Sequence, residues 1–339
     1  MKKDNSPPRG ESFIRLGLLA TALVIMIAAG EIAVRVWYRA LDGYDMEMWR
    51  YAREMKQRTG DAALPFINKP SAAGRYYGAE IRTNSQGCRS EELAAEKGDR
   101  KRLLFLGDSF TLGFGVPLEQ TFTSLIRQRL SGSTTTWEVI NAGVGNYNSL
   151  MELEWFKKYG AALQPDIVVL MFYLNDVEPT PRISGSGYFL ASHSYLYALL
   201  ADRSRKVLTR LGRDRYSWKK YYSHLYDDTN PALRLNREAL QELAALCKQN
   251  KARLVAVNIP DLHQLQPYPF PQATRYFERV CEENGIPCVD LLPQLQPHEP
   301  ARLWVSFEDT HANAFANGII ADTIFRTLCA LEAVPCGQR

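Results

Sequence analysis

Short apolar runs alternate with amphipathic stretches along the chain from Lys101 onward. An apolar run without internal alternation is typical of a parallel strand covered on both faces, and apolar residues three and four apart are typical of a helix. Strands are predicted at 102–106, 137–141, 166–172, 253–258 and 287–291, and helices at 119–130, 148–160, 233–250, 272–285 and 313–331. This alternation predicts an α/β domain with helices on both faces of a parallel sheet.

The apolar run near the amino terminus approaches the length of a bilayer. It extends without interruption from Leu16 to Gly30 and continues past Glu31 to Val36. A membrane-spanning helix needs about 20 apolar residues, with about 17 as a lower limit. We therefore expect a basic cytoplasmic tail at 1–12 and a transmembrane anchor at 13–36.

Flanking residues indicate how this helix is oriented. The cations Lys2, Lys3, Arg9 and Arg15 precede it, and the positive-inside rule places them in the cytoplasm. A cleaved signal peptide and a buried core helix are the alternatives. No clear small-x-small cleavage site follows the run, which favours an uncleaved single-pass anchor in a bacterial inner membrane, with the rest of the chain in the periplasm.

Two segments, 37–95 and 178–231, lack the clear alternation of apolar runs and amphipathic stretches. Residues 37–95 are expected to form a periplasmic connector with a helix at Met46–Arg58, and a main domain follows at 96–335. Within it, residues 178–231 form an insertion rich in tyrosine, arginine and lysine, with an amphipathic helical pattern at Ser194–Leu211. A lid or glycan-contacting cap and a packed helical excursion with a solvated basic face are both open interpretations.

Composition changes this picture little. The content of 46% hydrophobic and 23% charged residues is ordinary for a globular protein, and a scattered net charge of +4 argues against a nucleic-acid partner. The six cysteines form no Cys-x-x-Cys pair, so a zinc site is not expected. In an oxidising compartment, a disulfide could join Cys281 to Cys288 or Cys329 to Cys336, and free buried thiols are the alternative.

The stretch from Arg102 to Gly115 carries the strongest chemical signal. Its apolar strand stops at Gly107, and Asp108 and Ser109 follow directly. Ser109 therefore lies past the carboxyl end of a strand, where ligands bind in open α/β sheets. The glycines match neither a phosphate-binding loop nor a dinucleotide fingerprint, and Thr111 stands where a nucleophile elbow needs its second glycine. A helix cap is the structural alternative for Ser109.

The sequence GDSFTLGFGV, at 107–116, resembles the first block of the SGNH, or GDSL, superfamily of serine esterases and acyltransferases. Asn141–Asn148, Tyr173–Asp176 and Glu308–Asn313 resemble the later blocks, in the same order. Ile81–Arg89 resembles the entry segment of membrane-anchored members, where it covers a sheet edge. The resemblance covers residues 80–330 and implies a flavodoxin-like three-layer α/β/α fold of the SGNH type.

The same resemblance implies roles for individual residues. A serine nucleophile needs a base and a group that orients the base, which would be Ser109, His311 and Asp309. Of the five histidines, only His311 is flanked by carboxylates and lies in a segment that resembles the last family block. Glu308 stays open as a substitute for Asp309.

An oxyanion hole is also implied, with donors fixed before the reaction. The expected donors are the Ser109 backbone N–H, a loop N–H from Gly145 or Asn146, and the Asn175 side chain. The family has glycine where Asn146 stands, and Asn tolerates left-handed backbone better than most residues.

The implied function is that of a serine esterase acting on an O-acyl ester, such as an O-acetyl ester, through an acyl-enzyme at Ser109. One alternative is an O-acetyltransferase that modifies an exopolysaccharide or cell-envelope glycan, and another is a catalytically idle glycan-binding scaffold. No metal or dissociable cofactor is required. The expected partners are an acylated small molecule, glycan or lipid, the membrane, and envelope polysaccharide machinery.

Overall fold

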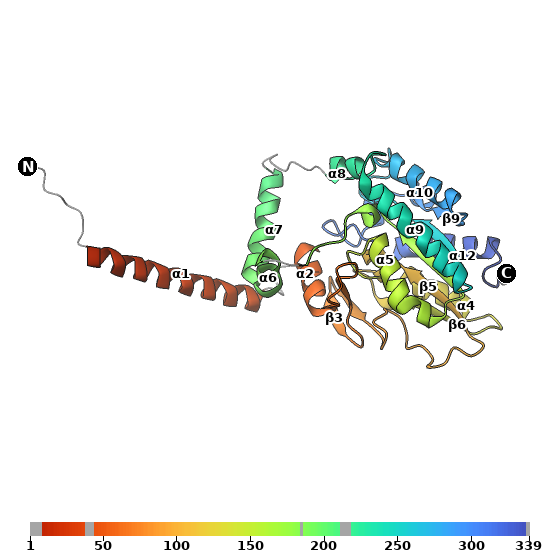
Figure 1. The fold of residues 1–339 in the computed structure, drawn as a ribbon, viewed down its shortest axis with the longest axis horizontal. Helices are drawn as coiled ribbons and strands as arrows, with labels where there is room; N and C mark the ends of the chain where they lie inside the picture. Colours follow the sequence, from red (N-terminus) through yellow and green to blue (C-terminus); the bar gives the residue numbers. More distant parts are fainter. Residues whose placement is uncertain (1–8, 38–43, 184–185, 211–217, 337–339) are drawn as a thin grey trace, which may run out of the picture. The chain divides into compact units, whose positions relative to one another are not determined.

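The computed structural model describes residues 9–37, 44–183, 186–210 and 218–336 (Figure 1). The chain divides into two compact units. One comprises residues 1–49 and 183–214, and the other comprises residues 50–182 and 215–339. The division passes through the insertion expected at 178–231, whose parts therefore belong to different units.

The first unit is helical and contains α1 (Arg9–Trp37), α6 (Ser186–His193) and α7 (Tyr195–Arg210). Figure 1 shows α6 and α7 beside the carboxyl end of α1. The stretch 13–37 of α1 has a mean hydropathy of 2.2, and it is long and apolar enough to cross a membrane. The predicted amphipathic helix at 194–211 is confirmed as α7.

Glu31, which interrupts the apolar run of α1, binds the start of α7. Its carboxylate accepts hydrogen bonds from Ser194 Oγ at 2.8 Å and from the Leu196 N–H at 3.0 Å. Arg35, one turn later on α1, donates to the same carboxylate at 2.8 Å. A carboxylate at a helix amino terminus satisfies N–H groups that lack an intrahelical partner.

The second unit is built on a five-stranded sheet, with strand order β6-β5-β7-β8-β9 and every pair parallel. In chain order this is 2-1-3-4-5, the flavodoxin-like order. The predicted parallel α/β sheet is confirmed. Its strands are β5 (Lys101–Leu106), β6 (Trp137–Asn141), β7 (Ile167–Phe172), β8 (Arg253–Asn258) and β9 (Cys288–Asp290).

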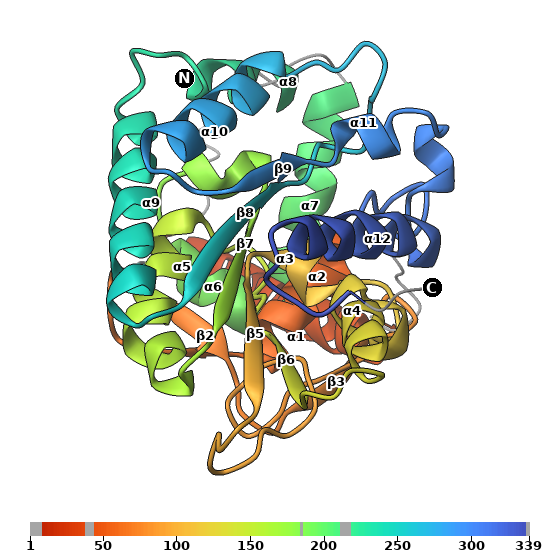
Figure 2. The ribbon, with the colours of Figure 1, turned by 90° about the vertical axis from the view of Figure 1, so that its right-hand side faces the viewer.

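Helices cover both faces of the sheet, as Figure 2 shows. On one face α4 packs against α12, and on the other α5 packs against α9. Buried side chains of β5, β7 and β8, among them Phe105, Val169 and Val257, pack with Ile320 and Ile324 of α12 in one hydrophobic core. The helices of this unit include α3 (Ser109–Leu112), α4 (Phe122–Leu130), α5 (Ser149–Trp155), α8 (Trp218–Leu225), α9 (Pro231–Gln249), α10 (Pro271–Glu283), α11 (Leu292–Leu295) and α12 (Ala314–Ala330).

The segment before β5 differs from the prediction. The expected helix at Met46–Arg58 is wrong at its carboxyl end, because α2 (Tyr44–Glu54) stops and β1 (Lys56–Arg58) begins. β1 pairs with β2 (Phe66–Asn68), and a second hairpin joins β3 (Ala73–Tyr76) to β4 (Ala79–Arg82). Lys69 donates to the Glu54 carbonyl at the end of α2, so a contact distant in sequence ends the helix.

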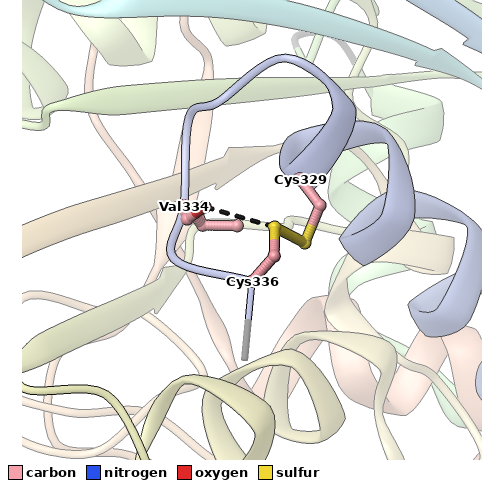
Figure 3. The surroundings of a disulfide bond; sticks show 3 residues. All are labelled: Cys329, Val334 and Cys336. Carbon is pink, nitrogen blue, oxygen red and sulfur yellow. Dashed lines mark hydrogen bonds between the residues drawn. A yellow bond between two sulfur atoms is a disulfide. The ribbon is translucent and has the colours of Figure 1, made fainter. Parts of the chain in front are cut away.

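A disulfide joins Cys329, in the last turn of α12, to Cys336 (Figure 3). This is one of the pairs expected from the sequence. The cysteines of the other pair carry free thiols, with Cys281 buried and Cys288 exposed. The disulfide therefore ties the segment that follows α12 to the last turn of that helix.

Candidate active site

Ser109 stands at a sharp turn between β5 and α3. Asp108 is the helix N-cap, and its carboxylate accepts the Phe110 N–H at 2.8 Å. Ser109 is therefore the first helical residue and not the cap. Gly107 before it is required by close packing, because a Cβ there would lie 2.0 Å from Thr111 Oγ1. The turn presents the Ser109 side chain and backbone N–H at the carboxyl edge of the sheet.

His311 lies in the loop that precedes α12. The loop is pinned where Val305 N–H donates to the His311 carbonyl at 2.9 Å. Asn313 caps α12 and donates from its side chain to the Trp304 carbonyl at 3.0 Å. The imidazole packs against Phe110, with ring centroids 4.8 Å apart. These contacts fix the ring orientation before any substrate arrives.

The structure brings Ser109, His311 and Asp309 together. His311 Nε2 lies 2.7 Å from Ser109 Oγ, and His311 Nδ1 lies 2.6 Å from Asp309 Oδ1. The same Asp309 oxygen accepts the His311 backbone N–H at 3.0 Å. All three residues are buried, with at most 7% of their surface exposed, whereas Glu308 is exposed. The histidine thus has a hydroxyl on one nitrogen and a buried carboxylate on the other.

The loop after β6 lies directly on the Ser109 turn. A Cβ on Gly143 would lie 2.2 Å from the Leu112 nitrogen, so only glycine allows this approach. Asn141, at the end of β6, donates to the Thr111 carbonyl at 2.6 Å. Asn146 adopts a left-handed conformation, with φ of 65°. Asparagine adopts this region more readily than most other non-glycine residues.

Asn175 follows β7, the strand beside β5. Its Nδ2 donates to the Tyr147 carbonyl at 3.1 Å, so it contacts the loop that carries Asn146. The same side chain lies close enough to the Asp108 carboxylate to lower its pKa. The loops after β5, β6 and β7 therefore meet at one edge, and the residues that the sequence predicted for the oxyanion hole lie on them.

Residues before β5, which the sequence did not indicate as part of a site, hold the same loops. Tyr51 Oη accepts the Gly145 N–H at 3.2 Å and donates to Asn68 Oδ1 at 2.6 Å. Asn68 Nδ2 in turn donates to the Gly143 carbonyl at 3.0 Å. The connector therefore supports the loop after β6, and no spacing in the sequence relates these positions.

Arg89 supports the other loop and is completely buried. Its guanidinium donates to the carbonyls of Leu112 at 2.8 Å, Val116 at 2.7 Å and Glu80 at 2.8 Å. Its backbone N–H donates to Asn141 at the end of the edge strand β6, at 2.9 Å. The Ile81–Arg89 segment thus contacts the sheet edge, as expected, and also fixes the chain that follows Ser109.

Buried carboxyl groups shape the electrostatics beside Ser109. Burial raises the pKa of Asp108 to about 6, although the Phe110 N–H and His311 lower it. Burial also raises the pKa of Glu152 and of Asp176 well above their usual ranges, and the nearby Asp108 carboxylate raises the pKa of both.

The residues that the structure describes contain no candidate metal site. No three or more His, Cys, Asp or Glu side chains lie in positions that could hold an ion there.

Comparison with solved structures gives similar folds at low identity. TesA aligns at 15% identity with a TM-score of 0.46, over 68% of this chain and 99% of its own. Axe2, an acetylxylan esterase from Geobacillus stearothermophilus, aligns at 16% identity with a TM-score of 0.46, over 68% of this chain and 95% of its own. A two-domain esterase active on acetylated mannans aligns at 15% identity with a TM-score of 0.45, over 71% of this chain and 53% of its own.

Comparison with curated proteins found no match. A model of the GDSL-like lipase/acylhydrolase family matches residues 105–317, which is more than half of the chain. The matched range contains the carboxyl end of β5, the turn of Ser109, the loops after β6 and β7, and the loop of His311. The chain therefore belongs to the GDSL-like lipase/acylhydrolase family.

Proposed function

We propose that this protein is a serine esterase that hydrolyses O-acyl esters through an acyl-enzyme at Ser109. The observation that carries the proposal is the continuous hydrogen-bonded chain from Ser109 Oγ to His311 Nε2, at 2.7 Å, and from His311 Nδ1 to Asp309 Oδ1, at 2.6 Å. A serine hydroxyl is a weak nucleophile unless a base lies within hydrogen-bond reach. The buried carboxylate keeps the His311 proton on Nδ1 and leaves Nε2 free to accept one.

The reaction proceeds in two acyl transfers. Ser109 Oγ attacks the acyl carbon while its proton moves to His311 Nε2, and a tetrahedral intermediate forms. The intermediate collapses, the alcohol leaves with the proton from Nε2, and the acyl group stays on Oγ. Water then attacks the acyl-enzyme with His311 again as base, and a carboxylic acid leaves as Ser109 regains its proton.

Charge on the oxygen of the intermediate needs donors that are in place beforehand. We assign this role to the Ser109 N–H, the Asn146 N–H and the Asn175 amide. The Gly145 N–H is already used by Tyr51 Oη, which favours Asn146 as the loop donor. The Asn175 Nδ2 has two N–H bonds and donates one of them to the Tyr147 carbonyl, which leaves the second for the oxyanion.

The acyl group is proposed to be small, such as acetyl. Ser109 is only 7% exposed, and Phe110 and Phe114 both pack against the His311 ring. Little room beside the hydroxyl favours a short acyl chain on a larger alcohol, such as a glycan or a lipid. An O-acetyltransferase would use the same acyl-enzyme and differ only in the hydroxyl that accepts the acyl group.

We further propose that the protein is a single-pass inner-membrane protein whose catalytic domain is periplasmic. The apolar stretch 13–37 of α1 supports an anchor, and the cations before it support a cytoplasmic amino terminus. The Cys329–Cys336 disulfide favours an oxidising compartment. In intact spheroplasts, added protease should degrade the domain that contains Ser109, and protection of that domain would contradict this orientation.

The proposed reaction is tested by mixing the detergent-solubilised full chain with p-nitrophenyl acetate and analysing the products. Acid quenching during turnover should trap one acetyl group on the Ser109 peptide, and Ser109→Ala should abolish both the adduct and p-nitrophenol release. Acetate should be the product in water alone. Persistent p-nitrophenol release by Ser109→Ala would contradict the proposal, and acetyl transfer to added oligosaccharide in preference to water would favour the transferase.

A further inference from the structure

Lys56 is a buried lysine that reaches the site from outside the family-matched range. It is the first residue of β1, opposite Asn68 in β2, and it is 9% exposed. Its Nζ lies 4.1 Å from the Phe66 ring centroid and 5.2 Å from the Tyr51 ring centroid. The β1–β2 hairpin thus buries a cation among aromatic rings.

The Lys56 amine binds the loop after β6. Nζ donates to the Gly145 carbonyl and, at 3.1 Å, to Asn146 Oδ1. Among the described residues, no carboxylate lies within ion-pair distance of it. Burying an ammonium group without a carboxylate costs free energy, so stabilisation of the fold gives little reason for a lysine at this position.

The geometry of one peptide group connects this contact to catalysis. The Gly145 carbonyl and the Asn146 N–H belong to the same planar trans peptide, so they point in opposite directions. A donor that holds the carbonyl on one side therefore holds the N–H on the other. Tyr51 Oη accepts the Gly145 N–H at 3.2 Å and restrains the preceding peptide, and Asn146 keeps its left-handed φ of 65°.

We propose that Lys56 is a positioning residue that directs the Asn146 N–H into the oxyanion hole. This inference depends on the proposed esterase function and extends it to a segment before the family-matched domain. Lys56 does not touch the reacting atoms. It acts through the Gly145–Asn146 peptide, whose orientation it fixes before the substrate binds.

The amine also strengthens the donor that it positions. A hydrogen bond to the carbonyl polarises the peptide, and such chains of hydrogen bonds strengthen one another by roughly 10–30% per bond. Burial lowers the pKa of Lys56 to about 7, so both protonation states are populated near neutral pH. Each state has N–H bonds to donate to Gly145, and the ammonium adds positive charge at the Gly145–Asn146 peptide.

The alternative is that Lys56 only fastens the hairpin to the domain. Lys69, in the same segment, provides a matched control because its Nζ donates to the Glu54 carbonyl at 2.5 Å and contacts no residue of the site. A purely structural role predicts similar effects of Lys56→Met and Lys69→Met, on thermal stability rather than on kcat. A positioning role predicts a selective loss of kcat with Lys56→Met, because a misdirected donor weakens binding of the transition state more than of the substrate.

The experiment compares the full-length wild type, Lys56→Met and Lys69→Met with p-nitrophenyl acetate. Removal of one oxyanion donor lowers the rate about 10²- to 10³-fold, and a misdirected donor should lose part of that, so we expect kcat to fall at least ~10-fold with KM within ~2-fold. Lys69→Met should retain wild-type kcat. A folded Lys56→Met with wild-type kcat would overturn the inference and leave the esterase proposal intact.

A second variant covers the case in which Lys56→Met does not fold. Tyr51→Phe keeps the ring and removes the hydroxyl that accepts the Gly145 N–H, so it frees the same loop, and we expect a loss of kcat without a change in KM. Unchanged kcat in this variant would overturn the inference. A wild-type protein that neither hydrolyses the ester nor reacts with a fluorophosphonate would overturn the esterase function and this inference together.

Discussion

Replacement of Asp309 by asparagine changes the charge and hydrogen bonding of the proposed triad while keeping its shape. The carboxylate is completely buried and lies 2.6 Å from His311 Nδ1, a short distance for a charge-assisted hydrogen bond. One Asp309 oxygen accepts both the His311 backbone N–H and the Nδ1–H. The Oδ1 of asparagine can take over both contacts, but only as a neutral and weaker acceptor.

The expected loss follows from that loss of charge. A neutral amide holds the Nδ1–H tautomer less firmly, and it lacks the negative charge that stabilises the imidazolium formed when His311 takes the Ser109 proton. In a buried serine triad this substitution lowers kcat about 10³- to 10⁴-fold. At 1.36 kcal/mol per factor of ten, the transition state loses ~4 to 5.5 kcal/mol.

The assay is steady-state hydrolysis of p-nitrophenyl acetate, with a thermal melt for each variant. Glu308→Gln is the matched control, because Glu308 is the neighbouring exposed carboxylate, and kcat should stay within ~2-fold. The melting temperature of Asp309→Asn should change little, because the backbone hydrogen bond survives. A folded Asp309→Asn that keeps more than a tenth of the wild-type kcat, or a Glu308→Gln that loses as much as Asp309→Asn, would refute the assignment of Asp309.

Further predictions concern donors and buried charges. Asn175→Ala should lower kcat about 10²-fold with little change in melting temperature, and unchanged kcat would remove the amide from the oxyanion hole. Arg89→Leu should lower the unfolding free energy by at least ~3 kcal/mol in urea melts, because several buried carbonyls lose their donor, and the exposed Arg82→Leu should not. Burial raises the pKa of Glu152 above its unfolded value of 4.5, so the folded state binds more protons and stability falls as the pH rises past that value. Glutamine at position 152 does not titrate. The melting temperature of Glu152→Gln minus that of the wild type should therefore increase between about pH 5 and about pH 8, and a difference that stays constant would contradict the raised pKa of Glu152.

The parallel sheet could be predicted from the sequence because its central strands contain continuous apolar runs. Ile167–Phe172 and Leu103–Leu106 are buried at every position, and local patterns of this kind do not depend on distant contacts. The site residues of the turn and loops were identified from their resemblance to family blocks. Their meeting at one edge follows from the parallel topology, which brings the carboxyl ends of β5, β6 and β7 together.

The two hairpins before β5 could not be predicted from the sequence in this way. Lys56 was placed in a helix by local propensity, but pairing with Asn68 across a loop makes it a strand residue. Such pairings depend on partners that are distant in sequence, and short strands of three residues carry little periodicity. The contacts of Tyr51, Lys56 and Asn68 with the loop after β6 therefore became visible only in three dimensions.

Covalent labelling of Ser109 tests the central proposal most directly. The full chain in detergent is treated with a fluorophosphonate, digested and mapped by mass spectrometry, with Ser109→Ala and His311→Ala as controls. The proposal predicts a single adduct on the Ser109 peptide, none in Ser109→Ala, and a rate reduced at least ~10²-fold in His311→Ala. A folded wild-type protein without an adduct at Ser109, or labelling that persists unchanged in His311→Ala, would contradict it.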